Sequence, residues 1–228
     1  MKTLLLSLSV ILAGFSSKAQ DNYTIKMSVR TEGLPSEYAA YGEQEIVTYV
    51  KGDKTKTEVS SMMFTSTVYS DGKTVTSLTD AMGNKSAYKA TKEEIEESQK
   101  NDAKPKIEYT SEKKTIAGYE CTKAIITSIG KDKKEKVTIA WVTDKISSSQ
   151  SLARKAGGRT NLGDLKGQPM ALEMTMNQNG MDMKVLMTVT EVIIAPLEDS
   201  VFTINTEGFN VLTYKEMMEK QKSMMQGK

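Results

Sequence analysis

Short segments in which apolar and polar residues alternate run through most of this sequence, and small groups of turn residues separate them. Successive side chains of a strand point to opposite faces, so this alternation is typical of half-buried β-strands. Asp71-Gly72 is a dipeptide of two-residue hairpin turns, and a turn there would pair Val68 with Val75. The pattern predicts a mainly β, antiparallel protein. The predicted strands span residues 23–31, 45–51, 54–60, 63–70, 73–79, 85–89, 107–110, 114–129, 137–143, 170–176 and 181–192.

Two segments carry helical signals instead. Thr91-Lys92-Glu93-Glu94 is a capping box, and it predicts a short polar mid-chain helix before Pro105. Few apolar residues follow it, so we expect a solvated connector. The C-terminal segment 213–226 also has a helical pattern, and we expect its apolar face to dock on the sheet or to act as a lid over an apolar opening. That face carries Tyr214, Met217, Met218 and Met225.

Residues 1–20 have the pattern of a cleaved export signal. Lys2 precedes an apolar run that is too short for a stable membrane anchor, and Ser17-Lys18-Ala19 has the small-x-small form of a cleavage site. Phe15 stands where a lipoprotein would carry its acylated cysteine. We expect residues 21–228 to form a single domain, periplasmic or secreted, with no transmembrane span after signal cleavage.

The composition excludes several kinds of site. The chain has no histidine and one cysteine, so Ser-His-Asp and Cys-His catalysis, imidazole metal sites and an intrachain disulfide framework are all excluded. Without Lys2 and Lys18 the 31 basic residues become 29, equal to the 29 acidic residues, and this balance does not favour nucleic acid as a partner. Paired-carboxylate hydrolysis is still permitted, but nothing marks a particular pair. We therefore expect no enzyme activity and no cofactor, with Cys121 as a buried thiol.

The segment 170–192 carries the strongest functional signal. A four-residue loop, Asn177-Gln178-Asn179-Gly180, would pair Met176 with Met181 and Met174 with Met183. One face of this hairpin then carries a set that we call the methionine ribbon. Its members are Met170, Leu172, Met174, Met176, Met181, Met183, Val185 and Met187.

Three interpretations of the methionine ribbon are open. Methionine fills irregular gaps, so the ribbon can be ordinary sheet core. The same unbranched thioether chains adapt to flexible partners, so it can instead line a groove for an apolar or amphipathic ligand. Thioether sulfur also selects Cu(I), although no histidine or nearby cysteine supports a copper site here.

Two motifs carry a resemblance to a known group of proteins. Ile116-Ala117-Gly118-Tyr119-Glu120-Cys121-Thr122-Lys123-Ala124, followed by Trp141-Val142-Thr143, resembles the I-x-G-Y-x-C-x-K-A and W-x-T strands of Bacteroidota envelope proteins. These include the GLPGLI group and a related domain-of-unknown-function family with a LolA-like fold. Tyr49-Val50-Lys51-Gly52-Asp53-Lys54 is similar to their early Y-x-K-G-D-K hairpin. The resemblance implies an antiparallel half-barrel or open barrel and a periplasmic address. Asp199-Ser200-Val201 also resembles the D-[ST]-aliphatic site at which these bacteria O-glycosylate exported proteins.

We therefore expect a non-enzymatic periplasmic protein that binds or carries a lipid or acyl chain on the methionine ribbon. Removing the chain from water would supply about 0.8 kcal/mol per buried methylene. The C-terminal helix, or the loop after Ile146, would act as the lid. A structural or interaction module with an envelope protein partner is the alternative, and a thioether Cu(I)-binding protein is the third possibility.

Overall fold

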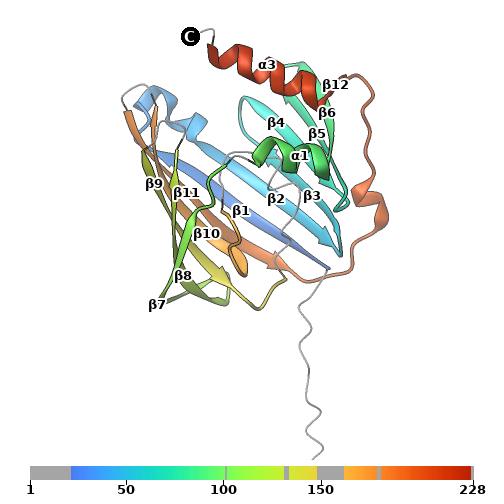
Figure 1. Ribbon diagram of the computed structural model, residues 1–228. Coiled ribbons are helices and arrows are strands. Elements are labelled where there is room, and N and C mark those ends of the chain that lie inside the picture. The colour runs from blue at the N-terminus through green and yellow to red at the C-terminus, as the bar shows by residue number, and fades with distance from the viewer. Residues whose placement is uncertain (1–21, 101, 131–133, 148–161, 179–180, 227–228) are drawn as a thin grey trace, which may run out of the picture.

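The strands of this protein form one sheet. A computed structural model describes residues 22–226 except 101, 131–133, 148–161 and 179–180 (Figure 1). The leader and most of the loop after Ile146 therefore lie outside the described residues. The strands are β1 (Asn22–Glu32), β2 (Glu43–Lys51), β3 (Lys54–Ser60), β4 (Phe64–Ser70), β5 (Thr74–Ala81), β6 (Asn84–Thr91), β7 (Lys106–Ile116), β8 (Tyr119–Ile129), β9 (Glu135–Thr143), β10 (Gln168–Gln178), β11 (Met181–Ile193) and β12 (Asn210–Thr213). The helices are α1 (Lys92–Gln99), α3 (Tyr214–Gln226) and the short 3-10 helices η1 (Ser36–Gly42) and η2 (Asp199–Phe202).

The sheet is open and strongly curved. Its strand order is β12-β6-β5-β4-β3-β2-β1-β11-β10-β9-β8-β7, and all neighbours are antiparallel except β12 and β6. Cα atoms of β7 come within 8 Å of β11, although three strands separate the two in the sheet. A flat sheet would hold them about 19 Å apart. The strands from β11 to β7 therefore roll up, and Figure 1 shows the sheet bending around the side that carries α1. The predicted mainly β, antiparallel open architecture is confirmed.

The predicted register of the β4–β5 hairpin is wrong in detail. Val75 pairs with Ser70 and not with Val68, because the Asp71 carboxylate accepts hydrogen bonds from the amides of Lys73 and Thr74 and moves the turn along the chain. The shift is two residues, so each side chain keeps its face.

The predicted strand at 114–129 is in fact the turn and second half of a hairpin. Ala117 and Gly118 have φ angles of 48° and 83°, so they form a left-handed two-residue turn between β7 and β8. Alanine seldom adopts this conformation, so the sequence pattern did not indicate a turn at this position.

One face of the sheet, the inner face, carries the core. Near one edge it is closed by a row of cross-strand neighbours: Tyr23, Val50, Thr55, Ser70, Val75 and Ala90, all buried. The strand ends on this side, where the β2–β3, β4–β5 and β7–β8 turns lie, form what we call the base edge. The strand ends on the opposite side form the tip edge. Inside the roll, Leu162 and Leu165 of the loop before β10 pack against Leu172 and Ala140. These two leucines act as a plug between the rolled strands.

Both α-helices cover the inner face over β4, β5 and β6, away from the rolled strands. Thr91 and Glu94 form the predicted capping box of α1, and Thr213 and Glu216 form the same box at α3. Because β6 and β12 are parallel neighbours, both helices leave the sheet at the base edge. Ile95 of α1 is fully buried, so the prediction of a merely solvated connector is wrong. Its burial requires Tyr214 and the sheet, which the local sequence of the helix does not reveal.

Replacing Ile95 by alanine tests this assignment of α1 to the core. We expect Ile95→Ala to lower the free energy of unfolding by about 2–4 kcal/mol, since it leaves a cavity between α1, α3 and the sheet. The matched control is Ile129→Ala at the exposed end of β8, which should change it by less than about 0.5 kcal/mol. Urea unfolding followed by circular dichroism measures both. Equal effects of the two substitutions would contradict the assignment.

Candidate ligand-binding face

The methionine ribbon forms one face of the β10–β11 hairpin, as predicted, but its register differs. Met176 pairs with Met183, and Leu172 pairs with Met187. The predicted pairing of Met176 with Met181 is therefore wrong, because Met181 pairs with Gln178 and the connection between them has two residues. The four-residue loop was expected because every residue from 177 to 180 favours turns. The shift is again even, so the members of the ribbon still share a face.

Most of the described side chains of the ribbon are buried or half-buried. Met170, Leu172 and Met183 are buried, while Met174 and Met187 pack against the cluster that contains the plug. Val185 is half-buried. Met176, at the tip edge, is 42% exposed, and the side chain of Met181 lies outside the description. Met183, the cross-strand partner of Met176, is nevertheless buried, so Met176 is the one exposed side chain among the ribbon members that the structure describes.

A second apolar surface lies on the inner face between the plug and the helices. Met27, Ile46 and Val59 are direct cross-strand neighbours on β1, β2 and β3, and Phe64 and Val68 of β4 share their face. All five are half-buried, and we call them the central strip. Met27 packs against the buried cluster that contains Tyr23, and Val68 packs against the one that contains Ile95. Ile46, Val59 and Phe64 belong to none of the three clusters of described residues. The strip is therefore apolar surface that the protein's own core leaves partly open.

Burial along the strip shows in which direction the inner face opens. Thr55 and Val50, near the base edge, are 2% exposed. Towards the tip edge, Ile46, Val59 and Phe64 on the same strands are only half-buried. On β2, β3 and β4 the face is thus closed at the base edge and more open towards the tip edge, whereas Val29 of β1 stays buried there.

The central strip was not predicted from the sequence. Ile46 is followed by Val47, and Tyr49 by Val50, so both faces of this strand carry apolar residues and the alternation does not identify the inner one. Only the pairing with Met27 and Val59 shows where Ile46 lies.

The predicted lid residues lie at one end of the strip. Tyr214 is buried against Val75 and Ala90, and its hydroxyl lies 2.9 Å from that of Ser98 on α1. Met217 and Met218 are half-buried and pack against the same cluster, whereas the side chain of Met225 lies outside the description. Val68 belongs both to this contact and to the central strip, so α3 adjoins the strip.

The surroundings of the strip offer no reactive group. Its members are aliphatic or aromatic, interleaved with the hydroxyl residues Thr48, Thr57 and Ser66. Among the residues that the structure describes, no group of three or more His, Cys, Asp or Glu side chains could hold a metal ion. This arrangement can bind an apolar molecule, and the described residues of the strip and those interleaved with them carry no ionisable side chain.

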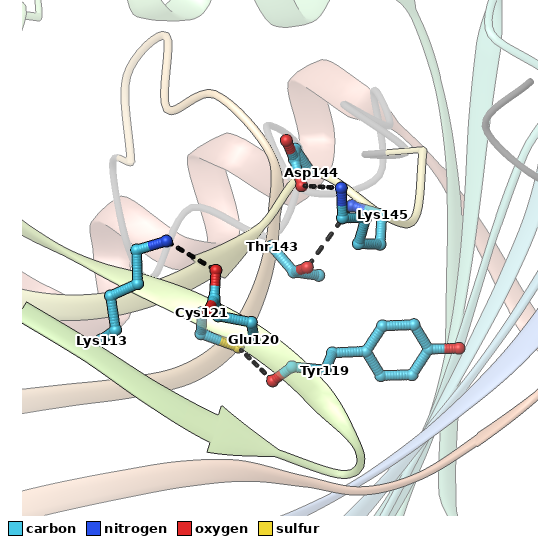
Figure 2. Close-up of polar contacts among 7 residues, drawn as sticks. All are labelled: Lys113, Tyr119, Glu120, Cys121, Thr143, Asp144 and Lys145. Atoms are coloured by element: carbon cyan, nitrogen blue, oxygen red, sulfur yellow. Dashed lines mark hydrogen bonds and ion pairs between the residues drawn. The ribbon is translucent and has the colours of Figure 1, made fainter. Parts of the chain in front are cut away.

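Cys121 is buried, as predicted, in the cluster that also contains Tyr23 and Met170, and its surroundings do not activate the thiol (Figure 2). Its Sγ donates a hydrogen bond to the carbonyl oxygen of Tyr119 at 3.4 Å. Lys123, the nearest candidate in sequence for activating the thiol, binds Glu112 instead at 2.8 Å. Burial raises the pKa of the thiol, which lowers the fraction of the nucleophilic thiolate.

Two surface features lie away from the inner face. A hollow of about 280 Å³ opens mainly on the opposite face of β2, β3 and β4, beside Glu45 and Glu58. Asp199 of η2 pairs with Lys51 and Lys54 at 3.2 Å and 3.1 Å, and these pairs attach η2 to the β2–β3 turn. Ser200, the residue that resembles a glycosylation site, is exposed, and its modification stays a prediction.

Searches of family models and of curated proteins found no match for this chain, so the resemblance to Bacteroidota envelope proteins also stays a prediction. Among solved structures, PNGF-II in its C2 form is 16% identical with a TM-score of 0.46; the match covers 89% of this chain and 33% of that one. The chain thus spans about a third of PNGF-II.

Smaller proteins are similar over most of their length. The lipoprotein LppX of Mycobacterium tuberculosis is 10% identical with a TM-score of 0.37, and the match covers 77% of this chain and 88% of LppX. A putative outer membrane lipoprotein-sorting protein domain from Vibrio parahaemolyticus is 7% identical with a TM-score of 0.33, over 80% and 89% of the two chains. These likenesses do not extend beyond general architecture. No described helix has the length and apolar character to span a membrane.

Labelling of the thiol tests the environment of Cys121. We expect Ellman's reagent at pH 8 to modify it at least about a hundredfold more slowly than an added thiol at Met82→Cys, which occupies an 84% exposed position. Unfolding in urea should remove the difference. Rapid labelling of Cys121 in the folded protein would contradict the burial and the raised pKa.

Proposed function

We propose that this chain is a non-enzymatic binding protein of the cell envelope that takes the acyl chain of a lipid against the central strip. The observation that carries the proposal is the partly open apolar surface of Ile46, Val59 and Phe64, with the plug on one side and the helices on the other. Its envelope location rests on the export signal predicted at residues 1–20.

The methionine ribbon extends this surface across β1. Met187 pairs with Val29, and Met27 pairs with Val189, so the inner faces of β1 and β11 are continuous. Met27, Met174 and Met187 are flexible and adapt their shape to a linear chain better than branched residues do. In this proposal the half-buried members of the ribbon contribute to the site, and Met170 and Leu172 support it from the core.

The two sides of the strip differ in how easily they can move. The plug is packed inside the roll, with Leu165 1% exposed. α3 rests on the sheet largely through Tyr214 and the half-buried Met217 and Met218. We therefore propose α3 as the movable cover, which can slide over a bound chain without unfolding the core.

A fluorescent long-chain fatty acid provides the direct test. We expect saturable binding to the purified protein, and loss of that binding in Ile46→Asp, because a carboxylate on the strip would have to be desolvated by the ligand. The matched control is Val47→Asp, the next residue on the same strand but on the opposite face. Thermal unfolding of both variants verifies that they fold.

The outcomes distinguish the candidate functions. Loss in Ile46→Asp with retention in Val47→Asp supports the proposal. No binding to the wild type, together with a lipid-free mass by native mass spectrometry of protein taken directly from the periplasm, favours an interaction module. A tight, saturable site for Ag(I) would favour the thioether metal site predicted for the ribbon.

Chain length gives an independent prediction. Each methylene added between ten and sixteen carbons should lower the dissociation constant about fourfold, since burying one methylene contributes about 0.8 kcal/mol of binding free energy. Titration calorimetry with a series of saturated fatty acids measures this slope. A flat dependence on chain length would show that the chain does not lie on apolar surface.

A further inference from the structure

Five of the connections between consecutive strands lie at the tip edge of the sheet. The connections β1–β2, β3–β4, β5–β6, β8–β9 and β10–β11 all lie there, because antiparallel strands reverse direction at every step. Gly33 confirms that two of them are close in space: a Cβ at Gly33 would lie 2.6 Å from the carbonyl oxygen of Asp182. Figure 1 shows η1 of the β1–β2 connection beside the ends of β10 and β11.

Large apolar side chains protrude from these connections into water. Met82 of the β5–β6 turn is 84% exposed, and Met62 of the β3–β4 turn is 73% exposed. Such exposure is unusual for residues of this size and marks an interaction surface when several occur together. We call the set at this edge the apolar rim. Its members are Tyr38, Tyr41, Met62, Met63, Met82 and Met176.

The base edge has the opposite chemistry. The β2–β3 turn there is Lys51-Gly52-Asp53-Lys54, and the β4–β5 turn contains Asp71 and Lys73. Exposed apolar residues near this edge are Ile193 and Ile194, at 37% and 38%, where the chain leaves β11. The β3–β4 and β5–β6 turns at the tip edge therefore differ from the β2–β3 and β4–β5 turns at the base edge, although all four face the same solvent; the β8–β9 connection at the tip edge, residues 130–136, is charged. A general tolerance of the fold for exposed methionine does not account for this difference.

The tyrosines of the rim are held in place. η1 packs closely on the end of β1, because a Cβ at Gly42 would lie 2.8 Å from Cδ1 of Leu34 and 2.9 Å from the carbonyl oxygen of Thr31. Tyr38 and Tyr41 stand on this turn with ring centroids 6.1 Å apart. Tyrosine has an apolar ring and a polar end, which suits the boundary between water and hydrocarbon.

The geometry of the rim favours a fluid partner over a folded one. Its side chains stand on separate turns, and the turns of successive hairpins are about 10 Å apart because two strands lie between them. A protein interface needs a contiguous, closely packed apolar centre, whereas a bilayer adapts its shape around separate protrusions. Residues 59–70, which include the β3–β4 turn, carry no charge, so nothing there opposes entry into the lipid interface.

We propose that the apolar rim docks this protein on the surface of a lipid bilayer, with the methionines of the tip-edge turns inserted among the lipids. This inference deepens the proposed function, because the inner face opens towards the same edge and Phe64 of the central strip directly follows Met63 of the rim. A docked protein would present the open end of its binding face to the source of acyl chains.

Flotation with phosphatidylcholine vesicles tests the docking. We expect the wild type to float with the vesicles, and Met62→Ser/Met63→Ser/Met82→Ser to lose about tenfold or more of its partitioning. The matched control, Ile193→Ser/Ile194→Ser, removes exposed apolar residues from the base edge and should float like the wild type. Raising the salt concentration should leave flotation unchanged, since the inserted turns are not held by charge.

A site-specific probe tests the orientation. Acrylodan attached at Met82→Cys should shift to the blue on addition of vesicles, whereas the same probe at Asp53→Cys, on the base edge, should not; the buried Cys121 stays unlabelled. Equal shifts at both positions, or no flotation of the wild type, would overturn the proposal. Concentration-dependent dimers that the triple substitution abolishes, without flotation, would show that the rim binds a second copy and would also overturn it.

Fatty-acid binding without vesicles separates this inference from the proposed function. The triple variant should keep the fatty-acid affinity of the wild type, because its substitutions lie outside the central strip. A wild type that binds fatty acids but does not float would remove the docking and leave the binding function intact. A wild type that floats but binds no fatty acid would remove the binding function and leave the docking intact.

Discussion

The covering of one face of a twelve-stranded open sheet is the constraint on which the rest of this structure depends. The sheet reduces the area that must be covered, because the strands from β11 to β7 roll up until β7 approaches β11. The plug of Leu162 and Leu165 fills that roll. The helices α1 and α3 cover the opposite end. The described chain leaves the middle, at Ile46, Val59 and Phe64, only half-buried. A partly open apolar strip is therefore a consequence of how few covering elements the described part of the chain provides.

The parallel pairing of β12 with β6 decides where the helical cover lies. β12 has four residues, and alone it would add little to the sheet. It aligns Thr213 with Lys89, so that α3 begins almost where α1 begins, and each start is fixed by a threonine–glutamate capping box. Capping boxes stabilise a helix start by roughly 1 kcal/mol, and they fix position as well. The contact of Ser98 with Tyr214 then couples the two helices.

Faces of strands could be predicted from this sequence, whereas the registers of the β4–β5 and β10–β11 hairpins could not. Val68 and Val75, and likewise Met176 and Met183, share the faces expected for them although both pairings moved by two residues. Alternation fixes parity, whereas the turn fixes register, and side-chain hydrogen bonds such as those of Asp71 choose between neighbouring turns. The ribbon was visible because its partner face is polar; the central strip was hidden because Ile46 and Val47 are both apolar.

Polar groups interleave with the apolar residues of the inner face, and four of its hydroxyl residues pair with one another, whereas the buried Oγ1 of Thr55 near the base edge has no hydrogen-bond partner. The hydroxyls of Thr48 and Thr57 lie 3.2 Å apart, and those of Ser66 and Thr79 lie 3.3 Å apart. One hydroxyl of each pair donates to the other, so each pair leaves one O–H donor in place of two for water to satisfy. In the proposed function, a bound acyl chain would then cover fewer unpaired hydroxyl groups, each of which costs about 1–3 kcal/mol when it is buried. The pairing thus reduces the cost of placing threonine and serine beside the apolar residues of the strip.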